Sequence, residues 1–168
     1  MADFDITALI LSEHDAFRRA FTEIEALTDT DELRTRWTEL ADQLEVHAAG
    51  EEEVFYPQLL RKVDESEEDT EHAIKDHNKI RDAVNAVAGH DVGSDAWWEA
   101  FKNAREETVE HLEEEEHDVL PPFQAEVDED KRSEIGMRWL KFHEEHDAAK
   151  GLSGEKLDPK EYVEEHSP

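Results

Sequence analysis

An internal duplication of histidine and glutamate positions restricts the fold of this chain more than any other feature of its sequence. Each half carries one histidine, a second histidine 33 or 34 residues later, and a glutamate four residues after the second histidine. Matching halves indicate that one helical unit is used twice. The positions are His14, His47 and Glu51 in the first half, and His77, His111 and Glu115 in the second.

The residues around these positions match as well. Glu13-His14 aligns with Asp76-His77, and Pro57 aligns with Pro121. Apolar residues recur at spacings of three and four, which predicts amphipathic helices. We expect helices over about 6–27, 33–59, 74–89, 94–120 and 131–150, with Pro57 bending or ending the second and Pro121-Pro122 ending the fourth.

Amphipathic helices joined by short loops predict an all-α protein, an up-down-up-down four-helix bundle. We expect this bundle to occupy residues 1–127. Residues 128–168 would add a short fifth helix and a tail, which either stays free or docks. A homodimer contact is one role open to this segment.

On the second and fourth helices the repeated histidine and glutamate share one face with apolar residues, because a four-residue step rotates a helical side chain by only about 40°. This face is expected to point into the bundle. Tyr56 follows Glu51 by five residues, so we expect it to point aside. The shared faces are Leu40, Leu44, His47, Glu51 and Phe55 on the second helix, and Ala104, Thr108, His111, Glu115 and Val119 on the fourth.

Burying carboxylates and imidazoles is costly unless they are paired or bind a metal ion. The chain has no cysteine, so thiolate and iron–sulfur sites are excluded, while imidazole and carboxylate fit iron, manganese or zinc. Two glutamates from opposite helices can each bridge two ions. We therefore expect two non-haem iron ions with a water, hydroxo or oxo bridge; a mononuclear or zinc-filled site is the alternative.

Other polar residues near the repeat are expected on the surface, since runs of charge are usually solvated. Arg18 and Arg81 are related by the repeat but lie off the predicted ligand face. Surface positions are also expected for Glu52, Glu53, Glu113, Glu114, His117, His143 and His146, and a hydrogen bond from His143 or His146 to a residue behind the ligands is the alternative for that pair.

The charge balance limits the partners of this protein. It has 47 acidic and 18 basic residues, a net charge of −29, which repels nucleic acid. It has no apolar run that spans a membrane, and its first residues lack the basic start of a signal peptide, so we expect a cytoplasmic protein. An acid-rich surface suits high salt, which screens self-repulsion, and this predicts a halophilic host.

The ordered motifs resemble the hemerythrin-like family, the HHE cation-binding domain, over about residues 6–123. The resemblance depends on His14, on His47 to Glu51 followed by FYP, on DHNKIR at His77, and on His111 to Glu115 followed by VLP. It implies a four-helix bundle that holds a di-iron centre. Family functions include reversible dioxygen binding, oxygen or iron sensing, nitric oxide handling and peroxide decomposition.

The chain departs from the oxygen carriers of this family. Those proteins have two histidines four residues apart on the third helix, and an aspartate five residues after the fourth-helix histidine. Here His72 and His77 are five apart, and Glu116 replaces the aspartate. We therefore expect four histidines and two glutamates as ligands, with His72 as an optional fifth histidine. Some similar proteins use a tyrosine near the FYP position as an iron ligand.

These features predict a di-iron protein that binds dioxygen, peroxide or nitric oxide. A peroxide-decomposing, catalase-like enzyme is an alternative, for which Glu52 or Glu116 would supply the proton relay. An iron-sensing or iron-buffering module and a purely structural bundle without a metal also remain open.

Overall fold

The fold is described by a computed structural model, in which the structure describes residues 4–168. Within this range every regular element is helical, so the all-α prediction is confirmed. The elements in chain order are α1 (Ile6–Glu25), α2 (Thr30–Gly50), η2 (Glu51–Phe55), α3 (Tyr56–Lys62), α4 (Glu67–Ala88), α5 (Asp95–Glu114), η3 (Glu115–Val119), α6 (Leu120–Glu126), α7 (Glu129–Glu145), η4 (Asp147–Ala149) and α8 (Pro159–His166).

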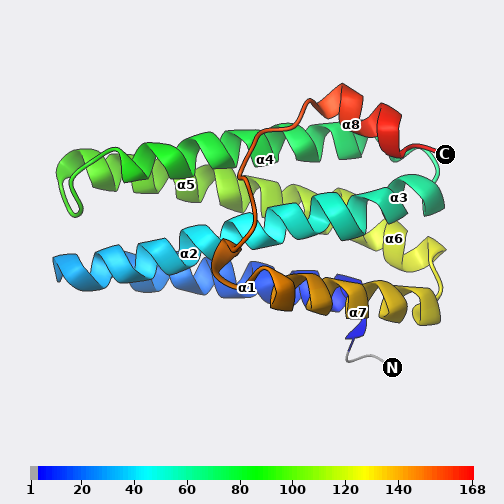
Figure 1. Cartoon of the computed structure of the whole chain (residues 1–168), viewed down its shortest axis with the longest axis horizontal. Coiled ribbons are helices and arrows are strands. Elements are labelled where there is room, and N and C mark those ends of the chain that lie inside the picture. Colours follow the sequence, from blue (N-terminus) through cyan, green and yellow to red (C-terminus); the bar gives the residue numbers. More distant parts are fainter. Residues whose placement is uncertain (1–3) are drawn as a thin grey trace.

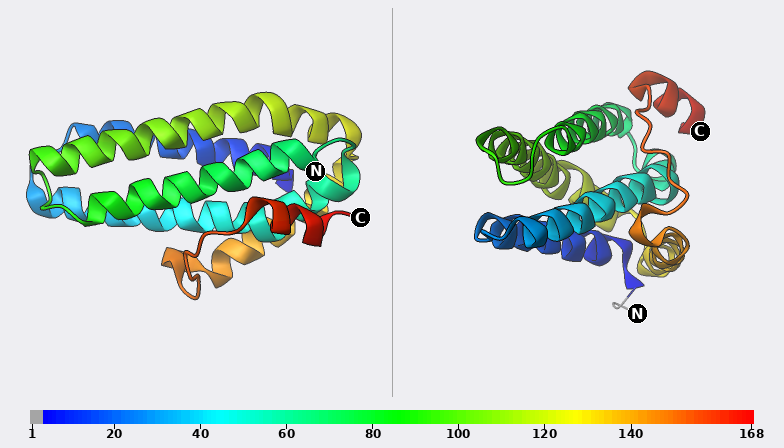
Figure 2. Two further views of the ribbon diagram at one scale, coloured as in Figure 1. Left: turned by 90° about the horizontal axis from the view of Figure 1, so that it is seen from above. Right: turned by 60° about the vertical axis from the view of Figure 1, so that its left-hand side comes forward.

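Two helical hairpins form the bundle (Figure 1). α1 and α2 make the first hairpin and α4 and α5 the second, which gives the predicted up-down-up-down four-helix bundle. α7 packs along α1 and α2, whereas α8 packs against α4 and α3 (Figure 2). Residues 147–158, here called the C-terminal crossover, pass over α2 and join the end of α7 to the start of α8.

Neither Pro57 nor Pro121 ends its helix. The prediction that Pro121-Pro122 ends the fourth helix is therefore wrong, whereas for Pro57 the prediction was a bend or an end. Each proline is preceded by one π-helical turn, η2 or η3, in which a backbone N–H bonds to the carbonyl five residues earlier. Proline lacks an N–H and its ring clashes with the carbonyl four residues before it. The wider π turn removes this clash, so the rods continue to Lys62 and Glu126.

The π turn at Pro57 also creates the docking point of α8. Glu52 precedes Pro57 by five residues, so its carbonyl oxygen receives no backbone N–H in the π pattern. The hydroxyl of Tyr162 on α8 donates to this oxygen instead. Asn78 on α4 makes two further bonds with the backbone of Leu157, at 2.7 and 3.1 Å. The predicted tail is thus a docked arm.

The apolar core consists of two clusters separated by a polar layer. One cluster, with Phe21, Trp37 and Trp97, fills the end of the bundle near the hairpin loops. The other, with Phe55, Phe123 and Trp139, fills the opposite end beneath α7. The buried histidines and glutamates of the repeat lie between the two clusters.

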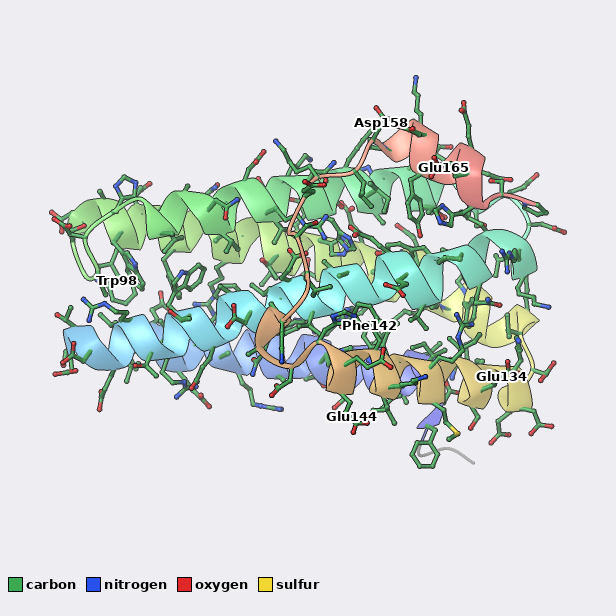
Figure 3. The ribbon with its side chains drawn as sticks, in the orientation of Figure 1. Trp98, Glu134, Phe142, Glu144, Asp158 and Glu165 are labelled. Carbon is green, nitrogen blue, oxygen red and sulfur yellow. The ribbon has the colours of Figure 1, made fainter. Side chains whose placement is uncertain are left out.

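The outer surface carries the acid excess. Acidic side chains such as Glu134, Glu144 and Glu165 point outward in Figure 3. Within the part of the chain that the structure describes, no helix is long and apolar enough to cross a membrane.

Asp5 joins the start of α1 to α7 and gives a test of this arrangement. Its carboxylate accepts hydrogen bonds from the backbone N–H and hydroxyl of Thr7, and from Arg132 Nε at 2.7 Å. Burial raises the pKa of Asp5, but the hydrogen bonds of Thr7 and Arg132 outweigh it and lower the pKa below its usual value.

We expect Asp5→Asn to lower the free energy of unfolding by about 1–2 kcal/mol at pH 7, because asparagine still caps the helix but loses the charge opposite Arg132. A carboxyl with a lowered pKa in the folded state contributes stability that is lost as pH falls through that pKa. Urea titrations of both proteins should therefore converge as the pH falls below the usual aspartate value of about 3.9 and through the lowered pKa of the folded state. Asp128→Asn at the exposed start of α7 is the control, and an equal cost at both pH values would contradict the prediction.

Candidate metal centre

Four histidines, one from each helix of the bundle, meet two glutamates in the polar layer. In every ring the Nε2 atom faces a glutamate oxygen within 4 Å, and each of the six residues is at most 3 % exposed. The structure thus brings together six of the seven residues predicted as ligands. They are His14 on α1, His47 on α2, His77 on α4, His111 on α5, Glu51 in η2 and Glu115 in η3.

The first group of donors, position A, consists of His14, His47, Glu51 and Glu115. His14 Nε2 lies 3.4 Å from Glu115 Oε1, and His47 Nε2 lies 3.0 Å from Glu51 Oε1. Donor atoms of the four residues lie within 4.8 Å of one another. Although these atoms lie close together, none of the four makes a contact with hydrogen-bond geometry within residues 4–168, which is rare for buried polar atoms. A metal ion bound among them would satisfy all four.

The second group, position B, consists of His77, His111 and Glu51. His77 Nε2 lies 3.0 Å from Glu51 Oε2, and His111 Nε2 has no partner within the described residues. The hydroxyl of Tyr56 lies among these donors, 3.0 Å from Glu51 Oε2, 2.7 Å from Glu115 Oε2 and 3.3 Å from His77 Nε2. One hydroxyl proton cannot satisfy three acceptors at once.

The prediction that Tyr56 points aside is wrong, and the reason is the π turn. On a regular α-helix a five-residue step rotates a side chain by about 140°. The backbone N–H of Tyr56 bonds to the carbonyl of Glu51 five residues earlier, so η2 returns Tyr56 to the face of Glu51. Tyr56 is fully buried.

His72 shows the opposite outcome of the same five-residue step. α4 is a regular α-helix from Glu67 to Ala88, so His72 and His77 point to different faces. The His72 side chain is 54 % exposed, and its Nε2 lies 2.8 Å from Glu114 and 3.5 Å from Asp76. The structure does not bring His72 into either position.

Each ring is oriented by a carboxylate on its outer side. An oxygen of one carboxylate lies 2.9 to 3.4 Å from the Nδ1 atom of each histidine. This geometry directs the Nδ1 proton outward and leaves the Nε2 lone pair for the centre. The pairs are Glu116 with His14, Glu13 with His47, Glu52 with His77, and Asp76 with His111.

Arg18 and Arg81 hold two of these carboxylates. The predicted surface position is wrong for Arg81, whereas the Arg18 side chain is 32 % exposed. Arg18 makes two bonds with Glu116, at 2.8 and 2.6 Å. Arg81, whose side chain is 6 % exposed, bonds both Glu52 and Glu45. The predicted solvation of Glu52 is wrong for the same reason, since its charge is neutralised inside the fold.

The glutamates change the acidity of the surrounding rings. Burial lowers the pKa of His111, but the contacts with Asp76 and Glu51 and the charge of Glu115 outweigh it and raise the pKa to about 10. Burial also lowers the pKa of His47, but the charge of Glu51 and the hydrogen bond with Glu13 outweigh it, so this pKa lies well above its usual value. Burial raises the pKa of Glu51, but the charge of His47 and the contact with His111 hold it well below its usual value. The carboxylates therefore attract positive charge to this layer.

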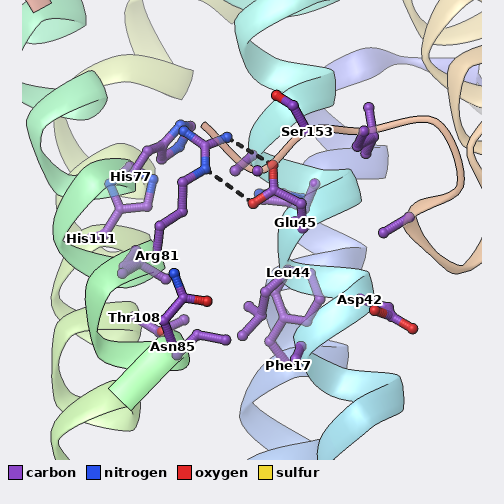
Figure 4. Close-up of a pocket in the computed structure, with 18 of the residues that line it drawn as sticks. Phe17, Asp42, Leu44, Glu45, His77, Arg81, Asn85, Thr108, His111 and Ser153 are labelled. Carbon is purple, nitrogen blue, oxygen red and sulfur yellow. Dashed lines mark hydrogen bonds and ion pairs between the residues drawn. The ribbon is translucent and has the colours of Figure 1, made fainter. Parts of the chain in front are cut away.

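A cavity of about 240 Å³ opens between α2 and α4 and reaches the rings (Figure 4). Its walls are mostly apolar, and the Arg81–Glu45 ion pair crosses it. The C-terminal crossover covers one side with Ala149, Leu152, Ser153 and Gly154. His47, His77 and His111 line its inner end, with Phe17, Leu44, Ile80, Val84 and Leu112 along the walls.

The family model described as the hemerythrin HHE cation binding domain matches residues 5–123. The chain belongs to this family. Comparisons with curated proteins and with solved structures gave no significant match. An HHE cation-binding domain with buried histidine and glutamate groups supports a metal site, and α7 and α8 lie beyond the matched region.

The sequence did contain a signal for the orienting carboxylates. Glu13 and Asp76 each directly precede the first histidine of their half. Glu52 and Glu116 each directly follow the glutamate ligand candidate of their half, so all four positions are repeated. Among 47 acidic residues, adjacency alone did not separate these four from solvated ones.

Metal binding at position A should stabilise the fold by mass action. We expect Zn²⁺ at 100 times its Kd to add about 2.7 kcal/mol, a rise in Tm of roughly 5–10 °C. His47→Ala removes one donor and should abolish most of this rise. His117→Ala, at an 87 % exposed side chain, should keep it. Calorimetry with and without metal measures the difference, and an equal metal-induced rise in both variants would contradict position A.

Proposed function

We propose that this protein binds two non-haem iron ions in the polar layer and binds a small ligand, dioxygen, peroxide or nitric oxide, at that centre. The observation that carries the proposal is the set of five buried donor atoms without hydrogen-bond partners among residues 4–168. They are Nε2 of His14, His47 and His111, and Oε1 of Glu51 and Glu115.

The donor set favours iron over softer metals. Imidazole and carboxylate donors without thiolate suit iron, manganese and zinc, and only the first two supply one-electron redox chemistry when bound. His14 and His47 would hold one ion and His77 and His111 the other. Glu51 and Glu115 each present one oxygen toward each position, which suits a bridging carboxylate.

The cavity between α2 and α4 supports a small ligand. Its walls are mostly apolar, and its inner end is lined by His47 of position A and by His77 and His111 of position B. A small ligand that enters this cavity would therefore reach both positions.

Binding is favoured over peroxide decomposition by the state of the two relay candidates. Turnover of peroxide needs a carboxylate that exchanges protons with the ligand. Glu116 is paired with Arg18 and Glu52 with Arg81, and both also face a histidine Nδ1. At Glu116 the hydrogen bond from Arg18 lowers the pKa of the carboxyl. At Glu52 burial raises the pKa, but the hydrogen bonds with His77 and Arg81 outweigh it and lower the pKa.

The deciding experiment uses the full chain loaded anaerobically with two equivalents of ferrous iron. We expect two ions per chain and a visible spectrum that appears with dioxygen or nitric oxide and reverses when the gas is removed. Oxygen evolution from added peroxide would assign the catalase-like alternative. A chain that takes up no iron would refute the proposal and leave a structural bundle.

Tyr56 gives a spectroscopic prediction for the loaded protein. Its hydroxyl lies among the donors of position B, so a ferric ion bound there should contact the phenol oxygen and give a visible charge-transfer band. Tyr56→Phe should remove this band while two ions remain bound. Tyr162→Phe is the matched control, because that hydroxyl donates to a backbone carbonyl outside the donor set. An unchanged band in Tyr56→Phe would exclude phenolate ligation.

A further inference from the structure

The helix α7 lies beyond the matched HHE region, yet it contacts a residue that orients the centre. α7 packs along α1 and α2, with Trp139 fully buried. Gly136 permits this approach, since a Cβ there would lie 1.5 Å from the carbonyl oxygen of Phe4. The close packing brings the end of α7 to the outer side of His47.

Two side chains of α7 contact Glu13, one at each carboxylate oxygen. Trp139 Nε1 donates to Glu13 Oε2 at 2.6 Å, and His143 Nε2 lies 2.8 Å from Glu13 Oε1. Glu13 Oε1 in turn lies 3.1 Å from His47 Nδ1. His143 is itself fixed, because its Nδ1 atom faces the carbonyl of Trp139 at 2.9 Å. The orientation of His47 thus depends on a chain of contacts that begins in α7.

The second half of the repeat has a weaker version of this arrangement. Asp76 occupies the position of Glu13 and faces His111 Nδ1 at 3.4 Å. Its other cationic contacts are His72 at 3.5 Å and Lys79 at 3.6 Å, and both side chains are more than half exposed. Asp76 is therefore held from the solvent side, whereas Glu13 is held by a buried indole and a half-buried imidazole.

We propose that Trp139 and His143 are positioning residues of the metal centre, which fix Glu13 and through it His47, and so make position A the tighter of the two metal positions. The inference rests on the proposed metal binding and adds that the C-terminal helix makes the two halves unequal. Residues that contact a metal ligand directly, as Glu13 does, change metal affinity by about 10- to 100-fold, and Trp139 and His143 act one contact further out, so we expect a smaller effect from them.

His143 separates positioning from simple packing better than Trp139 does. The indole belongs to the apolar cluster beneath α7, so its loss would also leave a cavity in the core. The His143 side chain is 27 % exposed, and its polar contact to Glu13 is the feature that a substitution removes. His143→Leu keeps bulk without a donor, and His143→Gln restores an N–H donor.

The test is a stepwise titration of the full metal-free chain with Co²⁺, followed by visible absorption. We expect two binding steps in the unaltered protein. His143→Leu should weaken the tighter step by up to about 10-fold and shift its absorption band, with the looser step unchanged. His143→Gln should return both the affinity and the band toward the starting values. His72→Leu, the matched change beside Asp76, should leave the tighter step unaltered.

Each other result counts against the inference. An unchanged tighter step in His143→Leu overturns it while the metal site stands. If His143→Leu weakens both steps equally and lowers the Tm of the metal-free protein, the inference is overturned, because His143 then acts only through packing. Absence of Co²⁺ binding in the unaltered chain overturns the inference together with the proposed function.

Discussion

The structure depends on burying two carboxylates and four imidazoles in one layer of a helical bundle. Such a layer destabilises a fold unless every charge has a partner. The partners form successive shells: glutamates at the centre, histidines around them, carboxylates behind the histidines, and arginines behind two of those carboxylates. The alternation of sign lets the layer lie between two apolar clusters. The unpaired atoms that remain are all at the centre, where a cation would bind.

The sequence predicted the part of this layer that regular α-helical geometry determines. Steps of three and four residues place His47 with Glu51 and His111 with Glu115, and the repeat supplies His14 and His77. The five-residue step from Glu51 to Tyr56 was misread, because the outcome of such a step depends on the backbone. Glu51 to Tyr56 spans a π turn and stays on one face, while His72 to His77 spans regular helix and does not. The proline five residues after Glu52, repeated at Pro121, was the available clue.

The orienting shell was beyond the sequence for a different reason. Its pairs join distant residues, such as Arg18 with Glu116 and Arg81 with Glu52, on elements that meet only in the folded bundle. Each of these residues is charged and adjacent to other charged residues, which is the pattern of a solvated face. Local sequence therefore favours exposure, and only the packing of the two hairpins against each other reverses it.

The C-terminal segment turns a nearly symmetric bundle into one with different halves. α7 lies against the first hairpin and closes the outer side of His47 through Glu13. α8 lies against α4 and is held by Asn78 and by the Glu52 carbonyl that Pro57 leaves free. Between them the crossover only partly covers the gap between α2 and α4, so the cavity persists beside His47, His77 and His111. The two halves of the site therefore differ in what lies behind their histidines, because α7 contacts the first half and α8 with the crossover lies against the second. Two identical repeats alone would not produce this difference, because each half would have the same outer contacts.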